Sequence, residues 1–242
     1  MEVGTVTPDG KTISRIEKIV GVRKMIAQHM EESLRRSPQV SGFSRMDMTG
    51  VVNLKKKLDE MGLKVSITEI FIKVVALAIE KNPYMNCSRQ GQEIHYYSSI
   101  NMGVAVADPK GMLMVPVIKN CEKKSLLEIS REMKEILALL KEGKLTPDRM
   151  TGGTFTISSL GMFNTDNSDP ILNIPQAGII CLGRIRKELI VNDDDTTSII
   201  PEAFVSVTVD HAVINGAPAS IFFRDLGEMT RTADQLITID EL

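Results

Sequence analysis

The chain has no tryptophan, three tyrosines, seven phenylalanines and only three cysteines among its 242 residues. Its charges nearly balance, with a formal net charge of −2, so nothing indicates nucleic acid or an anionic membrane surface as a partner. No apolar run approaches the roughly 18 residues of a membrane span, and the first residues lack the basic and then apolar pattern of a secretory signal. The remaining composition, 43% hydrophobic, is ordinary for a globular protein with a substantial core.

The three cysteines exclude two common roles. Cys87, Cys121 and Cys181 do not have the spacing of metal ligands, and an odd number cannot pair completely. We therefore expect reduced, mostly buried thiols in a cytosolic-type compartment, which is the cytoplasm of a prokaryote or the mitochondrial matrix of a eukaryote. Fourteen methionines and no tryptophan favour adaptable core packing.

Apolar periodicity predicts alternating helices and strands. Two sequences of the capping-box type, Ser66 to Glu69 and Ser125 to Glu128, mark the starts of helices. The predicted helices cover residues 21–36, 51–61, 66–81, 125–142 and 219–229. The predicted strands cover residues 40–48, 94–97, 101–107, 112–118 and 205–209, and a further strand runs through Gly183. Residues 192–195 are expected to form an exposed hairpin tip. Strands and helices without strict alternation favour an α+β fold over a doubly wound sheet.

His211 is the residue with the clearest chemical potential. It follows a β-branched strand and precedes a turn at Gly216. A histidine held where a strand stops can face a cleft, and its ordinary pKa near neutrality suits a general base. An isolated histidine in this position is more often a structural residue that bonds to backbone, so the surrounding pattern has to decide.

Two segments resemble one known family. The first is His211-Ala-Val-Ile-Asn215-Gly216, and the second is Thr151-Gly-Gly-Thr-Phe-Thr-Ile-Ser158-Ser159. Both are similar to the catalytic cores (E2) of the dihydrolipoamide acyltransferases of 2-oxo acid dehydrogenase complexes, which share the histidine motif with chloramphenicol acetyltransferases. Segments at 21–30, 101–107, 111–118 and 172–180 also resemble that family, in the same order along the chain.

The resemblance implies a fold and an assembly. The fold is the chloramphenicol-acetyltransferase-like two-layer sandwich of class α+β with a mixed sheet. Residues 1–20 would be an N-terminal arm or linker remnant, and residues 21–242 the catalytic domain. The implied unit is a homotrimer, which assembles further into a 24-mer or 60-mer, with the active site between subunits. Lipoyl domains and the E1 and E3 components are the implied partners.

The resemblance also implies a reaction, the transfer of an acyl group from dihydrolipoamide to coenzyme A. The lipoyl group would come from a lipoyl domain, of which this sequence shows no sign. His211 matches the family's base, Ser158 the hydroxyl that bonds the oxyanion, and Asn215 a residue that orients the histidine. Contacts to coenzyme A would fall at Lys55, Ser66 and Ser159. We expect His29 to be a surface or interface residue.

Three positions depart from the family pattern. Asn215 and Ala107 stand where aspartate is usual, and Leu139 lies where lysine is common. These departures leave open one alternative, a weakly active or inactive scaffold of the same type. A separate alternative is acetylation of a small hydroxyl compound such as an antibiotic. Which acyl group is carried is not determined, although Ser159-Leu-Gly-Met-Phe favours acetyl or branched-chain acyl over succinyl.

Overall fold

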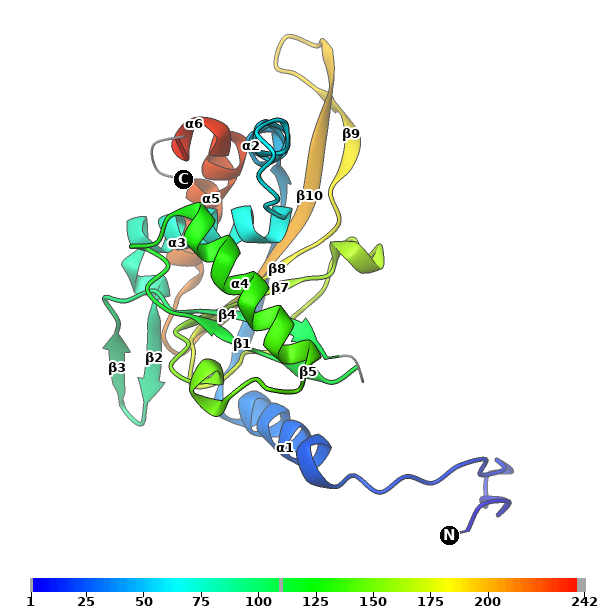
Figure 1. Cartoon of the computed structure of the whole chain (residues 1–242). Helices are drawn as coiled ribbons and strands as arrows, with labels where there is room; N and C mark the ends of the chain where they lie inside the picture. Colours follow the sequence, from blue (N-terminus) through cyan, green and yellow to red (C-terminus); the bar gives the residue numbers. More distant parts are fainter. Residues whose placement is uncertain (1, 109–110, 239–242) are drawn as a thin grey trace.

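The computed structural model of the chain describes residues 2–108 and 111–238, and it shows helices packed on a mixed β-sheet (Figure 1). The α-helices are α1 (Gly21–Arg36), α2 (Thr49–Glu60), α3 (Ile67–Lys81), α4 (Leu126–Lys141), α5 (Gly216–Arg231) and α6 (Ala233–Leu236), with short 3-10 turns η1 (Pro83–Met85), η2 (Pro147–Met150) and η3 (Gly161–Phe163). The strands are β1 (Gln39–Asp47), β2 (Cys87–Gln90), β3 (Glu93–Tyr96), β4 (Met102–Ala107), β5 (Leu113–Met114), β6 (Val117–Ile118), β7 (Phe155–Ser159), β8 (Gly178–Leu182), β9 (Arg186–Val191) and β10 (Thr197–Asp210).

The main sheet has the order β1-β10-β8-β7-β4-β5, with β6 added beside β4 and β9 beside β10. Strands β4, β7 and β8 are parallel, whereas β10 is antiparallel to both β8 and β1. The predicted mixed sheet and α+β class are therefore confirmed. Strands β9 and β10 extend as a long ribbon beyond the helices, and β2 and β3 form a separate hairpin (Figure 1).

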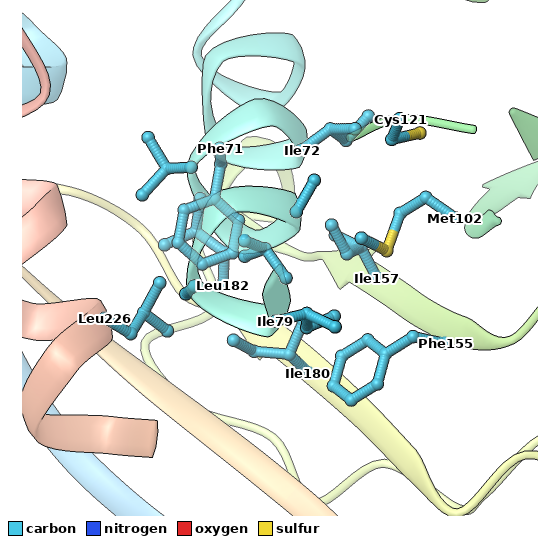
Figure 2. Packing of buried hydrophobic residues seen from close by; sticks show 14 of the residues in the cluster. Phe71, Ile72, Ile79, Met102, Cys121, Phe155, Ile157, Ile180, Leu182 and Leu226 are labelled. Carbon is cyan, nitrogen blue, oxygen red and sulfur yellow. The ribbon is translucent and has the colours of Figure 1, made fainter. Parts of the chain in front are cut away.

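One face of the sheet carries the apolar core. Helix α3 lies at its centre, with Phe71 and Ile79 fully buried among Ile157 and Ile180 of the sheet (Figure 2). Burial of such side chains contributes on the order of 2 kcal/mol each. This core fixes the ends of the strands, and those ends carry the candidate site residues.

The other face is polar, because successive strand residues point to opposite sides. The loop between η3 and β8 covers part of it. The Ser206 hydroxyl donates to the carbonyl of Ser168. The Thr156 hydroxyl donates to the side-chain oxygen of Gln176 at 2.5 Å. The polar loop thus takes the place that a second helical layer would occupy.

Both predicted capping boxes are confirmed. Ser66 accepts from the Glu69 amide at 3.2 Å, and Glu69 accepts from the Ser66 amide at 2.7 Å. Glu69 is buried and also accepts from the Ser130 hydroxyl at 3.0 Å, so the cap of α3 ties this helix to α4. Ser125 caps α4 in the same way.

Some predicted elements differ from the structure. The strand expected over residues 112–118 is two short strands, because Pro116 has no amide to donate and only its carbonyl bonds, to the Val104 amide. The helix expected over residues 219–229 is longer, running over Gly216–Arg231. Strands β2, β7 and β9 and helix α6 have no counterpart among the predicted ranges. The predicted hairpin tip at 192–195 is confirmed between β9 and β10.

All three cysteines are buried and free of disulfides. Burial raises the pKa of Cys87 to about 12 and that of Cys121 to about 12, and burial also raises the pKa of Cys181. Since the thiolate is the reactive form, we expect slow labelling of the folded protein by a thiol reagent at pH 8 and complete labelling of three thiols in denaturant. A timed absorbance assay with an aromatic disulfide reagent measures this. Labelling of any thiol within seconds in the folded state would contradict it.

Candidate active site

His211 is the first residue after the longest strand of the sheet. Its amide donates to the carbonyl of Pro38 at 3.0 Å, which ties it to the chain between α1 and β1. Its side chain is exposed in the single chain. The imidazole is thus carried on a fixed backbone and is open to a substrate or to another copy of the chain.

The turn that carries His211 is anchored by Asp210. The Asp210 carboxylate accepts from the Ala212 amide at 3.0 Å, and its carbonyl accepts from the amides of Val213 and Ile214 at 2.9 Å. This carboxylate is buried and pairs with Arg89 of β2, whose Nε lies 3.3 Å from it. No role was predicted for Asp210 from the sequence. The available signal was an acidic residue directly before the candidate base.

Asn215 is the N-cap residue of α5. Its carbonyl accepts from the Ala219 amide at 3.2 Å, but its side chain does not cap the helix. The Asn215 side chain is exposed in the single chain. Its orienting role therefore stays a prediction, while the adjacent turn is already fixed by Asp210.

Ser158 and Ser159 end strand β7 and face opposite sides of the sheet. The Thr68 hydroxyl of α3 donates to the Ser159 hydroxyl at 3.4 Å, so Ser159 faces the helices. Ser158 pairs in register with Cys181 on the other face. Burial raises the pKa of the Cys181 thiol, and a hydrogen bond with Ser158 opposes that rise. The two serines therefore face different sides of the sheet.

Ser158 and His211 lie at opposite ends of the sheet within one chain. Ser158 is level with Cys181 on β8, which is level with Ser206 on β10. His211 lies five residues beyond Ser206, and the two strand spacings and five residue rises place it roughly 19 Å from Ser158. One chain alone does not bring the predicted base and the predicted oxyanion donor together.

Two of the three predicted coenzyme A contacts, Ser66 and Ser159, lie in one region of the structure. Ser66 caps α3, and Thr68, two residues later, reaches Ser159, so Ser66 and Ser159 belong to one region. A serine hydroxyl that accepts one bond can still donate another. Lys55 of α2 forms an ion pair with Asp59 one turn later, and this carboxylate would compete with a phosphate.

Two positions that depart from the family pattern lie on β4 and α4. Ala107 is exposed at the end of β4, and Leu139 is half-buried on α4. The carboxylate of Asp108 accepts from the Met112 amide at 2.7 Å. Asp108 is therefore already engaged with Met112.

The other two histidines have partners outside the His211 turn. His29 of α1 is half-buried, and its Nε2 is 2.9 Å from the side-chain oxygen of Asn173. His95 of β3 is exposed and pairs with Glu93 at 3.0 Å. Within residues 2–108 and 111–238, no cluster of three or more histidine, cysteine or acidic side chains could hold a metal ion. No helix in that part of the chain is long and apolar enough to cross a membrane.

A mixed sheet with helices on one face and a histidine turn after its longest strand defines a protein of the chloramphenicol-acetyltransferase-like fold. A solved chloramphenicol acetyltransferase shares this fold, with a TM-score of 0.51 and 13% identity over 89% of this chain and all of that chain. Residues 11–238 match the model of the 2-oxoacid dehydrogenases acyltransferase family (catalytic domain). The chain belongs to this family.

Solved structures extend the comparison. A probable dihydrolipoamide acetyltransferase from Listeria monocytogenes has a TM-score of 0.86 and 31% identity, over 94% of this chain and 97% of that chain. The cubic core of a pyruvate dehydrogenase multienzyme complex has a TM-score of 0.83 and 29% identity, over 93% and 95%. A dihydrolipoamide acetyltransferase from Azotobacter vinelandii has a TM-score of 0.83 and 28% identity, with the same coverage.

Curated relatives carry different acyl groups. A succinyltransferase component of the 2-oxoglutarate dehydrogenase complex from Bartonella vinsonii is 30% identical over 225 residues, which are 91% of this chain and 54% of the relative. An acetyltransferase component of the acetoin cleaving system from Bacillus subtilis is 33% identical over 213 residues, 85% of this chain and 52% of the relative. The chain spans about half the length of the curated relatives it matches.

Proposed function

We propose that this chain transfers an acyl group from a dihydrolipoyl thioester to the thiol of coenzyme A, with His211 as the general base. The observation that carries the proposal is the His211 turn, where a family acyltransferase chain holds an exposed imidazole on a backbone anchored by Asp210 and Pro38. An imidazole with a pKa near neutrality can take a proton at physiological pH.

The reaction exchanges one thioester for another, and each step has a group to perform it. The neutral imidazole of His211 takes the proton of the coenzyme A thiol, whose ordinary pKa is about 8.5. The sulfur then adds to the thioester carbonyl, and the Ser158 hydroxyl donates to the oxyanion that forms. When the intermediate collapses, the carbon–sulfur bond to dihydrolipoamide breaks, and the leaving sulfur takes the proton back from His211.

Two copies of the chain are needed to build this site, because Ser158 and His211 are roughly 19 Å apart in one copy. We propose a homotrimer in which His211 of one copy meets Ser158 of the next. The exposed apolar side chains of α1 support this, since Val22, Met25 and Leu34 are 48%, 68% and 57% exposed in the single chain. A similar solved structure is a cubic core, so trimers that assemble into a 24-mer or 60-mer form part of the proposal.

The Azotobacter vinelandii structure supports the choice of residues. That structure comes from an investigation of the roles of a serine, a histidine and an asparagine in the catalytic mechanism of that enzyme. The asparagine there lies four positions after the histidine. His211 and Asn215 have the same spacing. The serine there lies 52 positions before the histidine, whereas here Ser159 lies 52 and Ser158 lies 53 positions before His211. We assign the oxyanion role to Ser158 from its place in the motif, and Asn215 remains the proposed orienting residue.

Coenzyme A would lie beside the start of α3, with Ser66 and Ser159 as proposed contacts and Lys55 as a proposed phosphate partner. The Thr68–Ser159 contact supports the first two. Lys55 would have to leave Asp59 to reach a phosphate. The lipoyl group would come from a lipoyl domain, and E1 and E3 components would supply and reoxidise it in the whole complex.

An assay with free substrates tests the proposal. The purified chain is mixed with coenzyme A and acetyl-, isobutyryl- and succinyl-dihydrolipoamide, and each acyl-coenzyme A is measured chromatographically. We expect turnover with the acetyl or isobutyryl donor in preference to succinyl. The absence of any product above a His211→Ala control would refute the activity and leave a scaffold.

A further inference from the structure

Arg89 connects three segments around the His211 turn. Its Nε lies 3.3 Å from the carboxylate of Asp210, and one of its terminal nitrogens donates to the carbonyl of Arg36 at the end of α1. That carbonyl belongs to the last turn of a helix, where backbone acceptors lack partners within the helix. Arg89 therefore caps α1 and pairs with the anchor of the histidine turn through one guanidinium.

Within the Arg89–Asp210 pair, the carboxylate is more shielded from solvent than the guanidinium. The Asp210 side chain is 8% exposed and that of Arg89 is 34% exposed. Both line a cavity of about 180 Å³, together with Ser37 and Gln176. Asp210 directly precedes His211 in the chain, so a change in the charge of this carboxylate acts on the nearby imidazole.

Other charged groups lie on the elements around the turn. Helix α1 contributes Arg36, which pairs with Glu32 at 3.1 Å. Helix α5 has no acidic residue in its first turn. The loop over the polar face contributes Asp169, which accepts from the Ser41 hydroxyl, and the neighbouring hairpin strand carries the His95–Glu93 pair. Arg89 is thus the cation paired with the carboxylate that precedes His211.

We infer that Arg89 is a positioning residue for the acyl transfer, which holds the His211 turn and sets the basicity of His211 by neutralising Asp210. This inference rests on the proposed function. It also gives a physical role to the residue before the histidine. Asn215, four residues after it, is neutral and cannot form an ion pair.

Opposite charge changes give opposite pH shifts. Arg89→Gln leaves an unpaired carboxylate that favours the imidazolium, so the acidic limb of the kcat/KM profile should move up by about half to one pH unit. Asp210→Asn leaves the cation unpaired and should move the limb down by a similar amount. The Arg89→Gln/Asp210→Asn double variant should return the limb close to its original position.

A second pair of comparisons separates position from charge. Arg89→Lys keeps the charge but loses the fork that reaches Arg36, so kcat should fall about three- to tenfold while the limb stays in place. Asp210→Asn can still accept from the Ala212 amide. In Asp210→Asn the unpaired Arg89 side chain is partly exposed, so water can solvate its charge. Asp210→Asn should therefore fold even if Arg89→Gln, which leaves a buried carboxylate unpaired, does not. Thermal unfolding and light scattering establish the folded and assembled state of each variant.

The pH profile of thioester exchange, measured on the whole chain with coenzyme A and the active donor, decides the matter. Shifts of opposite sign in Arg89→Gln and Asp210→Asn, or the downward shift of Asp210→Asn alone if Arg89→Gln does not fold, support the inference. If the wild type is active and depends on His211, but the acidic limbs of both variants coincide with that of the wild type, the inference is overturned and the proposed function stays intact. A wild type without His211-dependent exchange overturns both.

Discussion

Replacement of His211 by alanine is expected to lower kcat for thioester exchange by about 10²- to 10⁴-fold, the usual contribution of a positioned general base. The coenzyme A thiol must lose its proton as it attacks, and in the variant only water can accept this proton. The KM values for both substrates should change much less, because the imidazole acts in the transition state. Steady-state rates at pH 7.5 measure the effect.

The chain provides its own controls for this experiment, since it has only two other histidines. His29 bonds to Asn173 and His95 pairs with Glu93, so both imidazoles have partners outside the His211 turn. His29→Gln and His95→Gln should retain at least half of the wild-type kcat. A His211→Ala variant with more than a tenth of wild-type activity would refute the assignment of the base.

Replacement of Ser158 by alanine is expected to lower kcat by about 10²-fold or more, because a preorganised donor to an oxyanion contributes on the order of 3 kcal/mol. Ser159→Ala is the matched control on the adjacent residue. It faces the helices beside Thr68, so it should raise the KM for coenzyme A and leave kcat nearly unchanged. The reverse pattern would transfer the oxyanion role to Ser159.

Local patterns explain why much of the fold could be predicted. Each capping box lies within four consecutive residues, so the starts of α3 and α4 at Ser66 and Ser125 were readable from sequence. The prediction of one strand over residues 112–118 was wrong. The apolar pattern continues through Pro116, which has no backbone amide to donate to a neighbouring strand. Predicted amphipathic helix α1 has the expected bounds, Gly21–Arg36. Its apolar side chains at Met25 and Leu34 are nevertheless exposed in one chain.

For the candidate site, the sequence could predict the residues of each motif but not the distances between them. The motif around His211 is contiguous, so the sequence shows it directly. The distance between Ser158 and His211 depends on the register of β7, β8 and β10, which pair across long stretches of chain. The Arg89–Asp210 pair likewise joins residues far apart in sequence, and no local pattern indicates that they meet.

Mixed assemblies test the central claim most directly. His211→Ala and Ser158→Ala chains, each almost inactive alone, are unfolded together in equal amounts and refolded, or are coexpressed with different tags. If each site takes its base from one copy and its serine from the next, random mixing in a trimer gives both wild-type residues at about one site in four. The account therefore predicts recovery to about a quarter of wild-type activity. Activity no greater than the sum of the separate variants, in assemblies shown by the tags to contain both chains, would contradict it.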